Sequence, residues 1–148
     1  MAGLSEPSIP SLPSVCLVIT DLDGVLTDGS IGSISYNEIG ECMKRFYVWD
    51  GLVICMLEES GILVNVLSGC DFATLLNRVA DLGLTLHSFG VKDKAQACAA
   101  LISAAGVTRR QNVCIGDDSI DLPAFTACGL RYAVAMCQTM SSGKLKQC

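Results

Sequence analysis

Short apolar runs alternate along the chain with segments in which hydrophobic residues recur at helical spacing. Apolar runs of strand length stand at residues 15–19, 62–67, 84–89, 112–115 and 130–135. Helical periodicity marks residues 51–60, 71–83 and 93–106, and a short helix is expected before Cys128. Strands that alternate with helices predict βαβ units. We therefore expect an α/β fold of Rossmann-like type, with three α/β/α layers and a mostly parallel sheet.

Capping residues bound two of these helices. Asp71 is expected to cap the start of the first, and Gly83 to end it. The buried face of this helix would carry Phe72, Leu75, Leu76, Val79 and Leu82. Asp93 and Gly106 have the same positions in the next helix. Its predicted inner face carries Ala95, Cys98, Ala99 and Ile102.

The segment that follows the first strand breaks this alternation. Glycines at positions 24, 29 and 32 interrupt it, and apolar residues recur between Ile31 and Val48. Such a pattern is typical of a β-hairpin. We therefore predict a small β-hairpin flap directly after the first strand.

The two ends of the chain have a different composition. Residues 1–14 hold three of the four prolines together with serines, which predicts an unstructured leader. Residues 137–148 are polar and unpatterned. With 148 residues in all, we expect one domain at residues 15–136, between the leader and a polar tail.

Composition and charge exclude several classes of partner. Charged residues make up 17% of the chain, below the average of about 25%. Such sparse charge fits either a well-packed domain with buried strands or a surface covered by neighbouring subunits. The net charge is −5 and the basic residues are scattered singly, which is not typical of a protein that binds nucleic acid or an anionic membrane.

The nine cysteines form an odd-numbered set without a C-x-x-C pair. This spacing disfavours both a zinc site and a disulfide framework. Cys16, Cys55 and Cys114 lie inside apolar runs, where a reduced thiol behaves as a small buried hydrophobe. No apolar run approaches the roughly 18 residues of a membrane-spanning helix, and the first residues do not resemble a signal peptide. A reducing, cytoplasmic location is the expectation.

Polar and charged residues follow the predicted strands where each strand ends. These positions carry Asp21, Asp23, Ser68, Gly69, Lys94, Asp117 and Asp118. Ligands of a parallel sheet bind beyond the carboxyl ends of its strands, so these residues are expected to share one region. Carboxylates that converge in a partly dry site repel one another unless a cation neutralises them. Oxygen ligands without histidine or thiolate favour a hard ion, so the sequence predicts bound Mg²⁺.

Each of these residues also has a purely structural interpretation. An aspartate after a strand commonly caps a helix or forms a turn, and Ser68 also fits a turn. His87, the one histidine, fits the surface of a strand better than a catalytic role. Asp21 and Asp23 favour catalysis, because side chains two apart in an extended chain point the same way, as a nucleophile and its acid/base partner require.

The polar motifs resemble those of a known superfamily. DLDGVLTDG at residues 21–29 resembles the first motif of the haloacid dehalogenase-like superfamily. Ser68, Lys94 and GDDSID at residues 116–121 resemble its second, third and fourth motifs. Within that superfamily, residues 15–136 are most similar to the 3-deoxy-D-manno-octulosonate 8-phosphate phosphatases, and phosphatases of nine-carbon keto-sugar acids share the pattern. The resemblance implies a protein without a separate cap domain, which forms a homotetramer.

The resemblance also implies a role for each residue of the first motif. Asp21 would attack phosphorus and become an aspartyl phosphate. Asp23 would protonate the leaving sugar oxygen and then activate water. Mg²⁺ would be held by Asp21, the backbone carbonyl of Asp23 and Asp117, with support from Asp118 or Asp121.

The remaining site residues would bind the substrate. Ser68, Gly69 and Lys94 would hold the phosphoryl oxygens, where cations and donors stabilise the spreading charge. Asp50 and Arg78 would contact the rest of the molecule, with Arg78 placed for a carboxylate. The implied activity is Mg²⁺-dependent hydrolysis of a small phosphorylated sugar acid.

The chain departs from the family pattern at three places. Trp49 stands where relatives usually carry Arg or Lys, and Cys70 where they carry Arg or Glu. Relatives also continue through another strand and a final helix. These departures keep a second hypothesis open, a shortened inactive form or a non-catalytic assembly domain resembling the end of sialic acid cytidylyltransferases, in which the nucleophile is lost. A signalling receiver domain is disfavoured, because its phosphoacceptor Asp would stand where Phe89 and Gly90 do.

Overall fold

A computed structural model describes residues 15–27, 35–36, 42–43, 46–71, 73–84 and 86–134. Five strands form an entirely parallel sheet with the order β5-β4-β1-β6-β7. They are β1 (Leu17–Thr20), β4 (Leu63–Leu67), β5 (Leu86–Ser88), β6 (Asn112–Gly116) and β7 (Leu130–Ala133). The predicted α/β architecture is confirmed. The leader at 1–14 and the tail at 137–148 lie outside the described residues.

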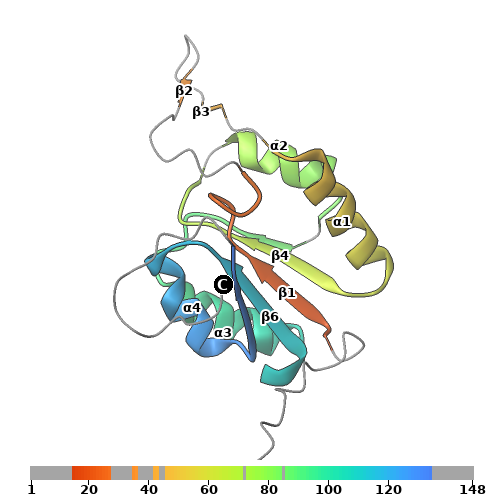
Figure 1. Cartoon of the computed structure of the whole chain (residues 1–148), viewed down its shortest axis with the longest axis vertical. Helices are drawn as coiled ribbons and strands as arrows, with labels where there is room; N and C mark the ends of the chain where they lie inside the picture. The colour runs from red at the N-terminus through yellow and green to blue at the C-terminus, as the bar shows by residue number, and fades with distance from the viewer. Residues whose placement is uncertain are drawn as a thin grey trace, which may run out of the picture.

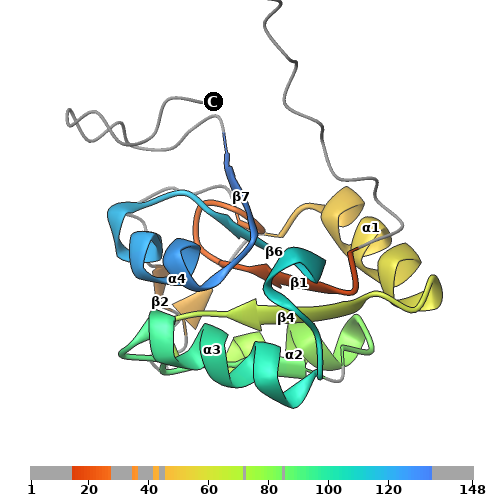
Figure 2. The same ribbon diagram turned by 90° about the horizontal axis from the view of Figure 1, so that it is seen from below.

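Helices cover both faces of this sheet, as Figure 1 shows. They are α1 (Val48–Glu59), α2 (Ala73–Asp81), α3 (Lys94–Ala104) and α4 (Leu122–Ala127). Helices α1 and α2 lie on one face, and α3 and α4 lie on the other (Figure 1). Figure 2 shows the strands β7, β6, β1 and β4 side by side in this order. No helix in the described part of the chain is long and apolar enough to span a membrane.

The central strand β1 supplies side chains to the cores on both faces. Val18 packs into the cluster beneath α1 and α2, together with Ile54 and Val79. Leu17 and Ile19 point the other way, into the cluster with Cys98 and Phe125 beneath α3 and α4. Alternate residues of a strand face opposite sides, and a strand with helices on both sides is therefore apolar throughout. This explains the unbroken apolar run that marked β1 in the sequence.

Capping explains where the helix α3 begins and ends. The carboxylate of Asp93 accepts a hydrogen bond from the backbone N–H of Gln96 at 3.0 Å, which confirms the predicted cap. Gly106 follows the helix with φ of +63°, a conformation that glycine adopts without steric cost. The inner face is only partly as predicted, because Cys98 is buried whereas Ala99 is exposed. Lys94, the first residue of this helix, is buried although it was not predicted on the inner face.

Helix α1 begins earlier than the hydrophobic pattern predicts. Val48, assigned from the sequence to the hairpin, is the first residue of the helix. The reason is that α1 is apolar on its outer side as well, where Val48 is 80% and Trp49 76% exposed. A helix without a polar face has no clear helical period, so its start is hidden in the sequence. On α2, Leu76 of the predicted face is likewise exposed.

A small antiparallel hairpin follows β1, as predicted. Strand β2 (Ser35–Tyr36) pairs with β3 (Cys42–Met43), and a bridge joins Thr27 to Phe46 at the base. The hairpin projects beyond the body of the domain in Figure 1. Ile31 and Ile34 of the predicted flap lie outside the described residues.

The strand order places a ligand-binding crevice at one position. Strand β1 lies between β4 and β6, and the chain reaches β4 first and β6 after β5. This reversal of direction from β1 is the topological switch point at which parallel α/β sheets bind ligands. We therefore expect the functional site at the carboxyl ends of β1 and β6.

We expect Leu17→Ala to destabilise the protein by about 3 kcal/mol, since it leaves a cavity under the central strand. Leu17 is 0% exposed. Urea unfolding followed by circular dichroism measures the change. Leu76→Ala, at an exposed leucine on α2, is the control and should cost less than about 1 kcal/mol. Equal losses in the two variants would contradict this account of the core.

Candidate active site

The turn after β1 carries the first two candidate carboxylates. The backbone N–H of Asp21 still bonds to Ile115 O at 2.8 Å, so the end of β6 fixes its position. The chain then curls back, and the N–H groups of Leu26 and Thr27 both bond to Leu22 O. Gly24 makes this possible with φ of +87°. The side chain of Asp21 is buried, whereas Asp23 is half-buried.

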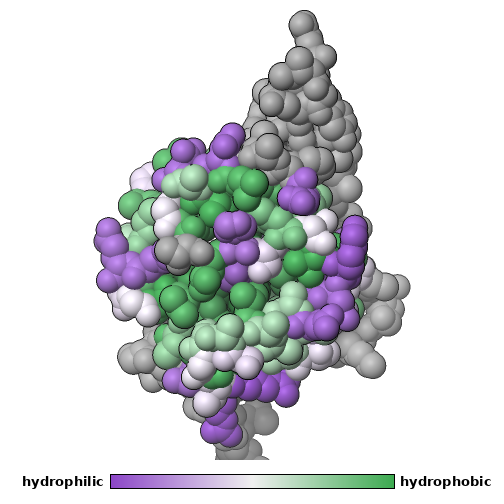
Figure 3. Space-filling model, turned by 180° about the vertical axis from the view of Figure 1, so that it is seen from behind, coloured by the Kyte–Doolittle hydropathy of each residue, from purple (hydrophilic) through white to green (hydrophobic). Residues whose placement is uncertain are grey.

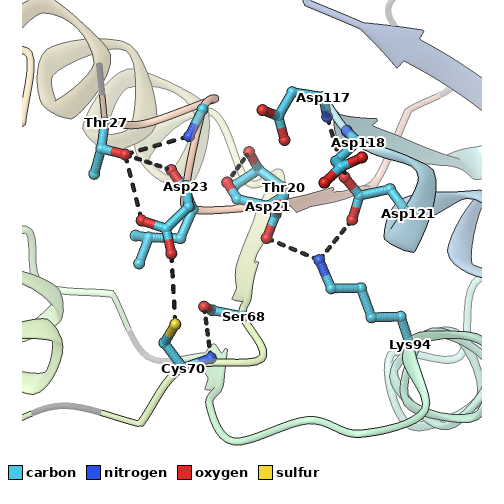
Figure 4. A network of polar contacts seen from close by, with 12 residues as sticks. Thr20, Asp21, Asp23, Thr27, Ser68, Cys70, Lys94, Asp117, Asp118 and Asp121 are labelled. Atoms are coloured by element: carbon cyan, nitrogen blue, oxygen red, sulfur yellow. Dashed lines mark hydrogen bonds and ion pairs between the residues drawn. The ribbon is translucent and has the colours of Figure 1, made fainter. Parts of the chain in front are cut away.

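The carboxylate of Asp23 faces away from Lys94, toward Thr27 and Cys70 (Figure 4). The hydroxyl of Thr27 lies 3.5 Å from Asp23 Oδ1. The thiol of Cys70 donates to Asp23 Oδ2 at a distance of 3.6 Å. Sequence reasoning assigned no role to Thr27 and did not foresee the Cys70 contact. The position of Thr27 inside the first motif was the one signal for its role. No local pattern indicated the contact between Cys70 and Asp23.

Lys94 connects two buried carboxylates. Its Nζ lies 3.0 Å from Asp21 Oδ1 and 2.6 Å from Asp121 Oδ1. Burial by itself would lower the pKa of Lys94, but the charge of Asp21 and the bond to Asp121 outweigh it and raise that pKa. The lysine therefore stays a cation, at a helix start where a cation is otherwise unfavourable. Figure 4 shows it reaching the pair from α3.

Asp121 organises the loop that follows β6. Its Oδ2 accepts hydrogen bonds from the backbone N–H groups of Asp117 at 3.1 Å and Asp118 at 3.3 Å. The residue before them has to be glycine, because a Cβ on Gly116 would lie 2.5 Å from Asp121 Oδ2. Both oxygens of Asp121 are thus occupied, one by Lys94 and the other by the loop. Asp118 in turn caps the short 3₁₀ turn through Ser119.

Three carboxylates converge at the ends of β1 and β6. Oxygens of Asp21, Asp117 and Asp121 lie within 4.8 Å of one another. Burial raises the pKa of Asp21 to about 6, against the opposing effect of Lys94, and the charge of Asp121 adds to the rise. Burial also raises the pKa of Asp117, helped by the charges of Asp121 and Asp118. One lysine therefore does not neutralise the cluster.

The donor set fits a hard divalent cation. The converging ligands are carboxylate oxygens, which Mg²⁺ prefers. Gly24 keeps the approach open, since a Cβ there would lie 1.8 Å from Asp117 Oδ2. Of the predicted ligands, Asp21 and Asp117 meet in this cluster, whereas the side chain of Asp23 is directed elsewhere. Asp121, predicted as a supporting residue, lies in the cluster itself.

Ser68 and Gly69 follow the neighbouring strand β4. The hydroxyl oxygen of Ser68 is buried and accepts a hydrogen bond from the N–H of Cys70 at 3.1 Å. The backbone of Ser68 bonds to Ser88 and Val91, which holds the residue at the end of its strand. Gly69 is exposed beside it. Figure 4 shows this turn facing the carboxylates from the opposite side of the crevice.

Asp50 and Arg78 line a cavity under α1 rather than the carboxylate cluster. The cavity has a volume of about 20 Å³, room for one water molecule, and Leu22 of the first motif also borders it. The guanidinium of Arg78 lies 5.3 Å from the centre of the Phe46 ring. Its Nε is buried and makes no hydrogen bond with any of the described residues. Gly51 gives it room, because a Cβ there would lie 2.7 Å from Arg78 Nη2.

The chain is similar to known bacterial phosphatases. The 3-deoxy-D-manno-octulosonate 8-phosphate phosphatase KdsC of Haemophilus influenzae is 52% identical over 124 residues, which cover 84% of this chain and 67% of that protein. The cobalt-bound structure of the Haemophilus influenzae enzyme superposes with a TM-score of 0.79 at 50% identity, over 86% of this chain and 72% of that one. No protein-family profile matches the chain.

Two further solved structures share the fold. The 3-deoxy-D-manno-octulosonate 8-phosphate phosphatase of Moraxella catarrhalis, in complex with magnesium, phosphate and KDO, has a TM-score of 0.73 at 35% identity, over 80% of this chain and 66% of that one. A putative HAD superfamily hydrolase of Legionella pneumophila has a TM-score of 0.80 at 31% identity, over 86% and 69%. The superfamily resemblance of the sequence motifs is confirmed by these neighbours.

Lys94→Met should destabilise the protein by about 3 kcal/mol at pH 7, because two buried carboxylates lose their cation. The deficit should shrink toward pH 4. Without Lys94 the folded-state pKa of Asp21 rises further above its unfolded value, so protonation at low pH favours the folded variant. Urea unfolding at both pH values measures this.

The matched control is Lys92→Met, which removes an exposed lysine two residues earlier. It should change the unfolding free energy by less than about 0.5 kcal/mol at either pH. A Lys94→Met deficit that is the same at pH 4 and pH 7 would rule out the electrostatic explanation.

Proposed function

The chain belongs to the 3-deoxy-D-manno-octulosonate 8-phosphate phosphatases of the haloacid dehalogenase-like superfamily, and from this membership we propose that it hydrolyses a phosphorylated sugar acid with Mg²⁺ as cofactor. The observation that carries the proposal is the carboxylate cluster of Asp21, Asp117 and Asp121, with Lys94 beside it. A phosphatase needs a nucleophile, a cation for the phosphoryl oxygens and a proton donor, and side chains whose chemistry suits these three roles lie at the switch point.

Asp21 is the proposed nucleophile. It lies at the end of the central strand, where the backbone bond to Ile115 fixes its direction. Its Oδ1 contacts Lys94, which leaves the other oxygen to attack phosphorus and form an aspartyl phosphate. Asp21, Asp117 and the backbone carbonyl of Asp23 would hold Mg²⁺, which would supply positive charge for the phosphoryl group.

Asp23 is the proposed acid and base. It is half-buried and stands two residues from the nucleophile. Contacts with Thr27 and Cys70 hold its carboxylate on the side away from Lys94. Such a carboxyl group can give a proton to the leaving sugar oxygen and then take one from the attacking water.

Ser68, Gly69 and Lys94 are proposed to bind the phosphoryl oxygens. The Ser68 hydroxyl accepts the N–H of Cys70, so its own proton remains to be donated to phosphate. The N–H of Gly69 lies on the same turn. Lys94 approaches from α3, and Figure 4 shows its ammonium group to one side of this turn. Positioning donors on two sides of the phosphoryl group is how enzymes stabilise its transition state.

The substrate we propose is 3-deoxy-D-manno-octulosonate 8-phosphate or a close relative such as a nine-carbon keto-sugar acid phosphate. The named relatives act on the former, and one holds KDO in its structure. Arg78 supports a carboxylate-bearing substrate, because a buried guanidinium nitrogen that has no hydrogen-bond partner among the described residues is costly until an anion pairs with it. Asp50 lines the same cavity, which has room for one water molecule in this structure, so we propose both residues as substrate contacts for a state in which this cavity is wider.

A homo-oligomer, specifically a tetramer, is also proposed. The outer side of α1 is an apolar stripe with no covering element among the described residues, formed by Val48, Trp49, Leu52, Val53 and Met56. Each of these side chains is at least half exposed. Apolar side chains also gather on the side away from the viewer of Figure 1, as Figure 3 shows. Exposed apolar surface of this extent is typical of subunit interfaces.

The cytoplasm is the proposed location. Among the described cysteines, Cys55, Cys98, Cys114 and Cys128 are free thiols. Free thiols in this number are typical of a reducing compartment.

Phosphate release from a panel of phosphorylated sugars and keto-sugar acids tests the activity. Asp21→Asn should reduce the rate by roughly 1000-fold or more, since the amide is no nucleophile. EDTA should have the same effect on the wild type, and Mg²⁺ should restore it. The matched control is Asp81→Asn at the exposed end of α2, which should keep the wild-type rate. No release by folded wild-type protein would favour the assembly domain or the inactive form.

Val53→Asp should shift the oligomer toward a 15.6 kDa monomer, because a charge in an apolar interface remains desolvated. Sedimentation equilibrium measures the mass. Leu76→Asp, on the exposed side of α2, is the control and should leave the mass unchanged. If the wild-type chain is a monomer at every concentration, the interface assigned to α1 does not exist.

A further inference from the structure

Three thiols that are far apart in the sequence meet in the core under α3 and α4. Cys98 comes from α3, Cys114 from β6 and Cys128 from the end of α4. Their sulfur atoms lie within 4.8 Å of one another, and their exposed fractions are 0%, 3% and 0%. Intervals of 16 and 14 residues do not form a recognisable ligand motif. The spacing of the cysteines in the sequence therefore did not indicate that these three meet.

The surroundings of the three thiols are apolar, with the cation of Arg109 at the edge. Leu17, Ile19 and Phe125 belong to the same core cluster. Arg109 donates from Nε to Cys128 O at 3.2 Å and from Nη2 to Thr126 O at 2.8 Å. The guanidinium of Arg109 thus lies beside Cys128.

We propose that Cys98, Cys114 and Cys128 form a second ion-binding site, which takes a thiophilic metal or metalloid ion through three sulfur ligands. Thiolates select soft ions, whereas the carboxylate cluster selects hard ones. The preferred soft ion is the one that gives the smallest net charge together with the three thiolates, because an apolar core disfavours a net charge. Three thiolates neutralise a trivalent ion such as As(III). A divalent ion such as Cd²⁺ leaves one negative charge, which Arg109 offsets in part.

Binding of arsenic needs no oxidant or reductant. Arsenous acid carries three hydroxyl groups and is uncharged near neutral pH, so it can enter an apolar core. Each thiol gives its proton to one hydroxyl group, which leaves as water while an As–S bond replaces the As–O bond. The product holds arsenic bound to three sulfurs, and three water molecules are released. Arsenic stays in the trivalent state throughout.

The three thiols lie on the elements that also carry the active site. Cys98 follows Lys94 by one turn of α3, Cys114 precedes Asp117 by three residues, and Cys128 ends the helix that starts after Asp121. Sulfur atoms that bind one ion must draw together, and these elements move with them. Ion uptake is therefore expected to lower phosphatase activity, a consequence that rests on the proposed function, whereas the uptake itself does not.

Mass spectrometry of the full-length, reduced protein after incubation with arsenite tests the site. We expect one arsenic per chain, seen as a mass increase of one arsenic atom less three protons. Arsenic should also raise the melting temperature by roughly 5 °C or more, because only the folded protein holds the three sulfur atoms together and therefore binds it more tightly than the unfolded chain does. Cys98→Ala and Cys114→Val should each abolish both effects. Valine is chosen because it packs well in a strand without a thiol.

Two control variants separate this site from the other cysteines. Cys55→Ser removes a thiol of α1, and Cys137→Ser combined with Cys148→Ser removes those near the end of the chain. Both should keep the full uptake. Circular dichroism and melting curves without arsenite identify variants that fail to fold, and the conclusion is taken only from folded ones.

Cadmium provides a second measurement on the same proteins. Cd²⁺ should produce the ultraviolet charge-transfer absorption of cadmium thiolate in the wild type, also when Mg²⁺ is in excess, and not in Cys114→Val. No uptake of either ion by the folded wild type would overturn the proposal, as would uptake that persists in Cys98→Ala and Cys114→Val. Uptake without any phosphatase activity would support the thiol site and count against the proposed function alone.

Discussion

The ion network of Lys94 with Asp21 and Asp121 is the constraint on which the site depends. It joins three elements that are distant in the sequence, the end of β1, the start of α3 and the loop after β6. Each group is buried, and a buried charge without a partner is strongly destabilising. The network can therefore exist only when the sheet and α3 are correctly assembled. The folding of this region and the assembly of its catalytic groups are the same event.

This constraint also explains the glycines of the site. Gly24 approaches Asp117 so closely that a Cβ would occupy the position of its carboxylate, and Gly116 stands in the same relation to Asp121. Carboxylates this close together repel, and burial raises the pKa of Asp21 and of Asp117. The protein accepts this unfavourable cluster because a divalent cation can relieve it. Repulsion among the acidic residues destabilises the folded protein. A bound ion relieves this repulsion, which increases the affinity for the ion.

What the sequence predicted well was local or tied to strand ends. The cap at Asp93, the hairpin after β1 and the convergence of Asp21 with Asp117 follow from spacing and from the topology of parallel sheets. The early start of α1 was not predictable, because an apolar outer face removes the helical period. The contact of Cys70 with Asp23 was not predictable either, since 47 residues separate them and no periodicity links their positions. Contacts of this kind are fixed by tertiary packing alone.

The two proposed ion sites differ in chemistry because they occupy different levels of the same elements. Strand β6 carries Cys114 inside the core and leads to Asp117 at its carboxyl end. Helix α3 carries Lys94 at its start and Cys98 one turn later. Carboxylate oxygens therefore gather at the carboxyl edge of the sheet. The sulfur atoms gather about one helical turn away from this edge, inside the core. A hard ion finds no oxygen ligands among the thiols, and a soft ion finds no sulfur among the carboxylates of Asp21, Asp117 and Asp121. Ligand chemistry thus separates the two sites, while the shared backbone keeps them mechanically connected.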